Sequence, residues 1–187
     1  MTAADAGRAP HVVLVGLPGA GKSTVGRRLA RRLGRPFLDF DAELARRAGR
    51  SVAAQFAEDG EPAFRAREAA LTREVAAPGV PAMVLAPGGG WVANGAAREA
   101  FAGAGRLVYL RVSVGAAARR LARSAEVRPL IAGAADPVAA VAALLERRQA
   151  LYESADLVVD GDSDDVEAVA AAVGAALAEA AAVPALG

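Results

Sequence analysis

Apolar residues along this chain gather in short runs, separated by longer segments whose apolar positions recur with helical spacing. The runs at 11–15, 82–86, 107–112 and 157–160 have the length and continuous apolarity of buried strands. A fifth short strand, ending in acid, is predicted over 36–41. Helices are predicted between the strands, over 25–33, 42–48, 52–58, 63–76, 96–102, 115–123, 137–153 and 164–182. This alternation predicts an α/β fold in which a five-stranded parallel sheet is covered by helices on both faces.

A glycine-rich loop follows the first predicted strand and precedes the first helix. It has the spacing G-x-x-x-x-G-K-S, beginning at Gly16. Glycines let the backbone turn tightly and point its N–H groups at a polyphosphate, and the start of the helix adds its positive dipole end. The residues predicted to hold a nucleoside triphosphate are Gly19, Ala20, Gly21, Lys22, Ser23 and Thr24.

Composition supports this interpretation of the lysine and excludes several other functions. Lys22 is the only lysine, since the other basic residues are all arginine. The 22 basic and 21 acidic residues give a net charge of +1, which argues against a general nucleic-acid or membrane surface. The chain has no cysteine and one histidine, so it has neither a disulfide framework nor a histidine metal cluster. No apolar run approaches the ~18 residues of a membrane span, and we expect a cytoplasmic, monomeric protein.

The domain boundaries are predicted from the same patterns. Residues 1–10 are small and polar and are expected to form a disordered leader, followed by one domain over 11–187. Residues 124–135 have little apolar periodicity and suit a lid.

The acid that completes the magnesium site of many phosphate-loop enzymes is missing after the third and fourth predicted strands. Asp39 and Asp41, at the end of the second strand, are the nearest replacements. Their i, i+2 spacing would place both on one side of a strand, one to support magnesium and one to meet an acceptor. The alternative is a pair of surface carboxylates, one of which caps the next helix. A guanine-binding Asn-Lys-x-Asp loop is excluded, because there is no second lysine.

Three arginines and a run of glycines are candidates for an acceptor site. Arg128 lies in the predicted lid, where it could approach a transferring phosphate, while Arg65 and Arg148 lie on helices and could bind a carboxylate. For any one of them the alternative is a solvated helix face. Gly88, Gly89 and Gly90 follow a buried strand and allow close approach of a ligand, although a simple turn needs only one glycine.

The ordered set of these motifs resembles shikimate kinase along nearly the whole chain. The motifs are the phosphate loop, Asp39 and Asp41, Phe64-Arg65 with Glu68, Gly88 to Gly90, Arg128-Pro129-Leu130, and Arg148 before Leu151-Tyr152. The resemblance implies a three-layer α/β/α P-loop kinase fold and transfer of the γ-phosphoryl group of ATP to the 3-hydroxyl of shikimate. It also implies a substrate-binding region at about 41–76, with ATP and Mg²⁺ as cofactors.

The resemblance further implies roles for individual residues. Lys22, Asp41 and Arg128 would be catalytic, and Ser23 and Asp39 would hold magnesium. Arg120 would approach the adenine. The residues that would bind shikimate are Asp41, Phe56, Phe64, Arg65, Gly88, Gly89, Gly90 and Arg148, with the two arginines on its carboxylate and the two phenylalanines beside its ring.

Three features depart from the family pattern. The lid segment 124–127 is short of the charged and polar residues often found there. Trp91 follows the glycines where a small residue is usual, so it either reshapes the acceptor pocket or points away onto a neighbouring helix. The loop 161–165 is acidic where the family often has an arginine near the adenine.

Two other functions stay open: a related small-molecule kinase, such as one for gluconate, and a nucleotide-binding regulatory module that has lost turnover.

Overall fold

A computed structural model of the protein describes residues 10–123 and 136–182. The sheet has five parallel strands in the order β2-β3-β1-β4-β5. Their bounds are β1 His11–Val15, β2 Phe37–Asp39, β3 Val84–Ala86, β4 Gly105–Arg111 and β5 Leu157–Asp160. The predicted α/β fold with a five-stranded parallel sheet is confirmed. Except for Pro10, the expected leader lies outside the described residues, and so does the whole of the expected lid.

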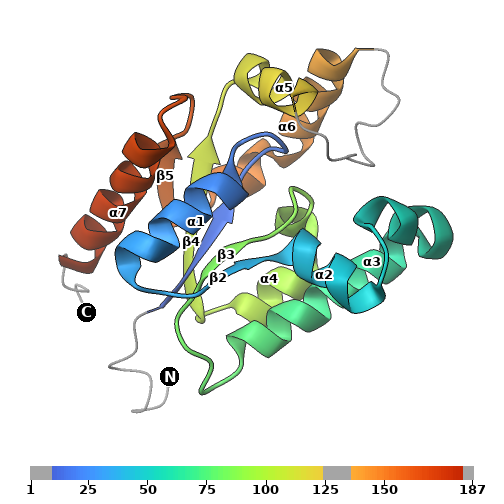
Figure 1. Ribbon diagram of the computed structural model, residues 1–187, viewed down its shortest axis with the longest axis horizontal. Helices are drawn as coiled ribbons and strands as arrows, with labels where there is room; N and C mark the ends of the chain where they lie inside the picture. The colour runs from blue at the N-terminus through green and yellow to red at the C-terminus, as the bar shows by residue number, and fades with distance from the viewer. Residues whose placement is uncertain (1–9, 124–135, 183–187) are drawn as a thin grey trace.

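Helices cover both faces of the sheet (Figure 1). They are α1 Lys22–Leu33, α2 Phe40–Ala48, α3 Val52–Ala76, α4 Gly95–Phe101, α5 Val114–Ala122, α6 Pro137–Glu153 and α7 Val166–Ala182, with a short 3₁₀ helix η1 over Trp91–Ala93. Helices α1 and α7 pack side by side on one face, and Arg28 of α1 pairs with Glu167 of α7 at 3.1 Å. Helix α6 lies on the other face, where the ring of Tyr152 stacks on Tyr109 of β4.

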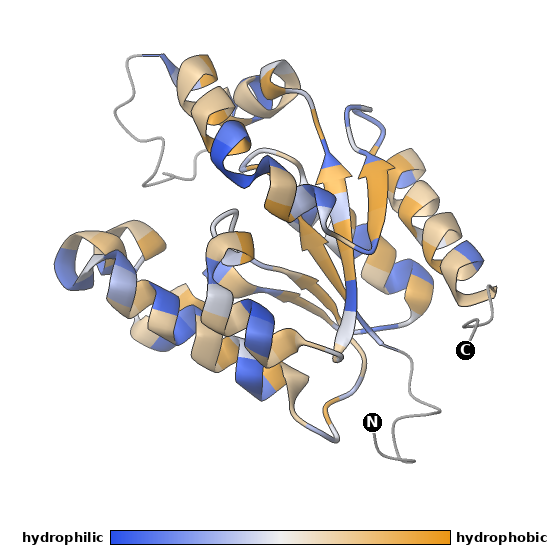
Figure 2. Ribbon diagram, turned by 180° about the vertical axis from the view of Figure 1, so that it is seen from behind, coloured by the Kyte–Doolittle hydropathy of each residue, from blue (hydrophilic) through white to orange (hydrophobic). Residues whose placement is uncertain are grey.

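The hydropathy of the chain follows these layers (Figure 2). Strands β1 and β3 are buried along their whole length, because helices cover them on both sides. Helix α1 shows the amphipathic pattern clearly, since it buries Val25, Leu29 and Ala30 and exposes its arginines. Among the described residues, no helix combines the length and apolarity needed to cross a membrane.

Local capping chemistry sets several element ends. The α1 helix is terminated by Gly34, whose φ of 62° is left-handed. Ser51 caps the start of α3 by accepting a hydrogen bond from the Ala54 N–H at 3.1 Å. Between the helices predicted over 52–58 and 63–76, α3 is broken at Gly60, which has a φ of 80° and a ψ of 164°. Only glycine adopts that conformation readily, and Pro62 is tolerated there because it lies in the first turn of the resumed helix.

One sequence expectation is wrong. The second strand ends at Asp39, and Asp41 lies in the first turn of α2, so the two acids do not share one face of a strand. The strand is shorter than predicted because Asp39 caps the helix: its Oδ1 accepts from the Ala42 N–H at 3.2 Å. For Trp91, the second of the two arrangements considered from the sequence is found: it points away onto a neighbouring helix. Its ring is buried against Phe101, and its Nε1 donates to Thr72 Oγ1 of α3 at 3.0 Å.

Candidate active site

The phosphate loop joins the end of β1 to the start of α1. Gly19 and Gly21 have backbone φ values of 82° and 86°, which residues other than glycine rarely adopt. A β-carbon at Gly19 would also lie 2.4 Å from the Ala117 carbonyl oxygen of α5. The Lys22 ammonium donates to the carbonyl oxygens of Gly16 and Leu17 at 3.0 and 3.1 Å, so it lies inside the loop. The loop therefore has the conformation and the cation that polyphosphate binding requires.

Asp39 lies beside the phosphate loop although it comes from a strand two places away in the sheet. Strand β3 separates β2 from β1, and Asp39 is in register with Ala86, the last residue of β3. The small side chain of Ala86 leaves room for the Asp39 carboxylate to extend over the end of β3 toward the phosphate loop. There, the Ser23 hydroxyl donates to Asp39 Oδ2 at 2.5 Å. One carboxylate thus both caps α2 and contacts the phosphate-loop serine. Oxygen ligands of this kind are those that magnesium prefers.

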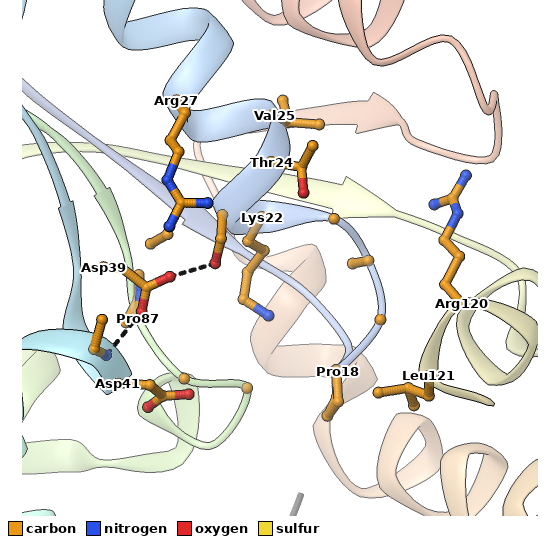
Figure 3. A pocket seen from close by; sticks show the side chains of 18 of the residues that line it. Pro18, Lys22, Thr24, Val25, Arg27, Asp39, Asp41, Pro87, Arg120 and Leu121 are labelled. Atoms are coloured by element: carbon orange, nitrogen blue, oxygen red, sulfur yellow. Dashed lines mark hydrogen bonds between the residues drawn. The ribbon is translucent and has the colours of Figure 1, made fainter. Parts of the chain in front are cut away.

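A single cavity of about 920 Å³ extends from the phosphate loop toward α2 and toward the loop after β5. Among the predicted site residues, those lining it are Gly19, Ala20, Gly21, Lys22, Ser23, Thr24, Asp39, Asp41, Gly88, Gly89 and Arg120. Figure 3 shows Asp41 and Arg120 on opposite sides of the phosphate loop. Asp41 therefore lies toward one end of the cavity and Arg120, paired with Asp164, toward the other, with Lys22 between them.

The triple glycine makes room for three different parts of the site. A β-carbon on Gly88 would lie 2.8 Å from Asp41 Oδ1, and one on Gly89 would lie 3.0 Å from Cδ of Pro18 in the phosphate loop. One on Gly90 would lie 2.1 Å from Arg65 Nη2. The close approach that these glycines allow is therefore to neighbouring site residues. All three glycines have a packing reason, which a simple turn does not supply.

Arg65 is held between two carboxylates of its own helix. Its Nε and Nη2 donate to Glu61 Oε1 at 3.1 and 2.9 Å, and its Nη1 donates to Glu68 Oε2 at 3.0 Å. Phe56 and Phe64 have ring centroids 5.7 and 5.6 Å from Arg65 Cζ, so the guanidinium also contacts aromatic rings. These two phenylalanines, Arg65 and Gly90 are not among the residues that line the cavity.

Glu68 is fully buried beneath Arg65. Its Oε2 also accepts from Asn94 Nδ2 at 3.0 Å, while its Oε1 has no hydrogen-bond partner among the described residues. Burial raises the pKa of Glu68, and the nearby charge of Asp41 adds to that rise, although the ion pair with Arg65 opposes it. The buried acid therefore holds the arginine in place at a cost in desolvation.

Arg148, on α6, contacts the glycine turn over 88–90 and is held by a backbone carbonyl group rather than by a carboxylate. Its Nη1 donates to the Gly89 carbonyl oxygen at 3.0 Å, and the Tyr152 hydroxyl donates to the same oxygen at 3.0 Å. Arg148 is 9% exposed and makes no ion pair with any described residue. Like Arg65, it lies outside the cavity lining and contacts the site through the glycine turn. Burial raises the pKa of Tyr152, so its hydroxyl keeps its proton as a donor.

Arg120 is fixed by the acidic loop that follows β5. Its guanidinium donates to the carbonyl oxygens of Gly161, Asp162 and Ser163 at 2.9, 3.1 and 2.9 Å, and to Asp164 Oδ1 at 3.2 Å. The departure in loop 161–165 is therefore compatible with an arginine at this end of the cavity, because the backbone of the loop orients it.

Two residues that hold the predicted site residues in place, Asn94 and Tyr152, were not predicted as site residues from the sequence. Asn94 caps α4 and donates to both the Arg65 carbonyl oxygen and Glu68, which nothing in its spacing indicated. Tyr152 shares the Gly89 carbonyl with Arg148; its i, i+4 spacing on a helix was the available signal. Arg128, predicted to contact phosphate, lies outside the described residues.

This sheet, with its phosphate loop at the carboxyl ends of the strands, is that of a P-loop kinase. The family model described as Shikimate kinase matches residues 18–178. The chain therefore belongs to the shikimate kinase family, as the resemblance of its motifs predicted.

Known relatives and solved structures agree on this family. A shikimate kinase of Thermobifida fusca (strain YX) is 48% identical over 147 residues, covering 78% of this chain and 81% of that protein. One of Pseudomonas savastanoi pv. phaseolicola is 42% identical over 170 residues, covering 90% of this chain and 96% of that protein. The structure of shikimate kinase from Acinetobacter baumannii in complex with shikimate superposes with a TM-score of 0.86 at 34% identity, covering 94% of this chain and 96% of that one.

Proposed function

We propose that this protein transfers the γ-phosphoryl group of ATP to the 3-hydroxyl of shikimate, giving shikimate 3-phosphate and ADP. The observation that carries the proposal is the cavity that the phosphate loop shares with Asp41 and the glycine turn. Membership of the shikimate kinase family and the likeness to a structure solved with shikimate support the same acceptor.

On the nucleotide side, the phosphate loop and Lys22 would neutralise the phosphates of ATP. Phosphoryl transfer needs mainly positioning and charge stabilisation, which backbone N–H groups and an ammonium provide. Ser23 and Asp39 would hold magnesium, a cation that neutralises charge on the phosphate oxygens when bound. Arg120 would face the adenine at the far end, and Arg128 would bring a further positive charge to the phosphates.

On the acceptor side, Asp41 would bind the ring hydroxyls and orient or deprotonate the attacking one. It faces the cavity from the first turn of α2, opposite the Lys22 side of the phosphate loop. Arg65 and Arg148 would bind the acceptor carboxylate from two helices, and the Gly88 to Gly90 backbone would close the site between them. Phe56 and Phe64, whose rings lie 4.6 Å apart, would pack beside the carbocyclic ring.

The gluconate alternative has less support. The structure of a gluconokinase from Sinorhizobium meliloti 1021 superposes with a TM-score of 0.59 at 22% identity, a likeness that shows the fold alone. The alternative of a regulatory module that binds nucleotide without turnover also has less support. Such a module does not need an acceptor acid, yet Asp41 lines the cavity together with Lys22, Ser23 and Asp39.

The deciding experiment is a coupled ADP-release assay with shikimate, with gluconate and without acceptor. We expect release that depends on shikimate and on magnesium, and background release with gluconate. Equal release with and without shikimate would contradict the proposal. Product analysis by mass spectrometry would confirm that one phosphate has been added to shikimate.

A further inference from the structure

Arg65 already has two anionic partners, which raises the question of how it could bind a third. Glu61 and Glu68 together carry two negative charges against one guanidinium. The charge of Asp41 also acts on Glu68, so it lies in the same electrostatic environment. A substrate carboxylate arriving beside these acids would be repelled unless one of the existing partners moved away.

The two partners differ in their freedom to move. The Glu68 side chain is 0% exposed and is tied to Asn94, so it has no solvent into which it could turn. The Glu61 side chain is 50% exposed and belongs to the first residue after the break at Gly60. Water can therefore solvate the Glu61 carboxylate at little cost when it leaves Arg65.

The contacts also show which part of the guanidinium would become available. Glu61 Oε1 occupies the edge formed by Nε and Nη2, the fork that binds a carboxylate in bidentate fashion. Glu68 binds the opposite nitrogen, Nη1, and the Gly90 backbone packs against the guanidinium. Arg65 would stay in place after Glu61 moved, because Glu68 and Gly90 hold it independently.

We propose that Glu61 competes with the carboxylate of the acceptor for the Nε and Nη2 edge of Arg65, and thereby sets the affinity of the enzyme for its acceptor. This inference rests on the proposed function. The apparent affinity of a site is reduced by the fraction of molecules in which the site is occupied by an internal competitor. Glu61 is in this sense a positioning residue: it acts on the acceptor only through Arg65.

The test compares Glu61→Gln with the wild type in steady-state kinetics, with shikimate and ATP varied in turn. Glutamine has nearly the same size but no charge, so its hold on the guanidinium is weaker. We expect the KM for shikimate to fall by about two- to five-fold, the range of an exposed ion pair. The kcat and the KM for ATP should not change, because the phosphate loop does not contact Glu61.

Glu58→Gln is the matched control. Glu58 lies on the same helix and pairs with Arg50, so this variant removes the same charge without touching Arg65. Its KM for shikimate should equal that of the wild type. Shikimate binding measured by calorimetry without ATP should show the same order of affinities, which separates binding from turnover.

The outcomes distinguish the two proposals. An unchanged or raised KM for shikimate in Glu61→Gln, with a wild type that phosphorylates shikimate, would overturn the competition and leave the proposed function intact. A fall of equal size in Glu58→Gln would also overturn it, because the effect would then come from net charge. A wild type without shikimate-dependent turnover would overturn both.

Discussion

The two halves of the cavity are built in different ways. The phosphate side comes from one continuous stretch, in which backbone conformation and residues 16–24 supply most of the groups. On the proposed acceptor side, Asp41 of α2 lines the cavity, while Arg65 of α3 and Arg148 of α6 lie behind the lining around the glycine turn, each held by a different partner. A local motif therefore specifies the first half, whereas the second half exists only once the tertiary structure has formed.

This difference determines what a mutation should do in each half. Under the proposed function, a change in the phosphate loop would act on ATP and on the transferred phosphate directly. A change on the acceptor side acts through chains of contacts, such as Asn94 to Glu68 to Arg65, so distant substitutions should alter acceptor binding while ATP binding is preserved.

The largest effect is expected for Asp41→Asn. Removing a group that orients or deprotonates the acceptor hydroxyl should lower kcat by about 10²- to 10⁴-fold. The dissociation constant for ATP, measured by calorimetry, should stay near the wild-type value because Asp41 lies on the acceptor side of the cavity. A near-normal kcat would remove Asp41 from its proposed role.

Lys22→Met should produce the next largest loss. An ammonium that stabilises developing charge on the phosphate is worth about 10²- to 10³-fold in kcat. Arg31→Met, which removes a cation from the exposed last turn of the same helix, serves as the control and should keep its activity. If both variants lost activity equally, the loss would reflect damage to α1 rather than chemistry.

Gly90→Ala should separate the two halves most sharply. The added β-carbon would lie 2.1 Å from Arg65 Nη2, so the arginine must shift. Overpacking of this kind costs about 1–3 kcal/mol, and we expect the KM for shikimate to rise at least fivefold with little change in the KM for ATP. Gly95→Ala is the control, because its β-carbon would meet nothing within 4 Å. A parallel rise in the KM for ATP would show that the halves are not independent.

Trp91→Phe tests the framework behind the glycine turn. It removes the hydrogen bond to Thr72 and leaves a small void beside Phe101. The free energy of unfolding, measured by urea denaturation, should fall by about 1–3 kcal/mol, while kcat in the folded protein is preserved. A large change in the KM for shikimate without loss of stability would instead place Trp91 in contact with the acceptor.

The smallest effect concerns acid stability of the α2 surface. Hydrogen bonds from Arg46 and Arg47 lower the pKa of Glu43 from 4.5 to about 2. A lowered carboxylate pKa contributes stability above the unfolded pKa and loses it as pH falls through the folded pKa, so the window runs from about 4.5 down to 2. Glu43→Gln should reduce the free energy of unfolding at pH 6 by less than ~1 kcal/mol, and the difference should vanish near pH 2. A difference that persisted at pH 2 would exclude titration of Glu43 as its cause.

Sequence patterns predicted the fold and the tight glycine turns of the phosphate loop, for a physical reason. The loop conformation depends on glycines, and buried parallel strands are apolar on both faces, so both leave a local trace in the chain. The position of Asp41 was misjudged because Asp39 caps a helix, and capping competed with extension of the strand. Contacts such as Asn94 with Glu68, or Gly90 with Arg65, join segments more than 20 residues apart and leave no periodic signal.

The two carboxylate oxygens of Asp39 accept hydrogen bonds from different elements, one from the first turn of α2 and one from Ser23. These two hydrogen bonds join the corner where magnesium is proposed to bind to the start of α2. An acceptor-driven rotation that preserved both bonds would have to pivot farther along the chain. Gly49, which ends α2 with a φ of 66°, and Gly60 within α3 have positive φ values that suit such a hinge. The metal ligand would then stay in place while the acceptor region moves.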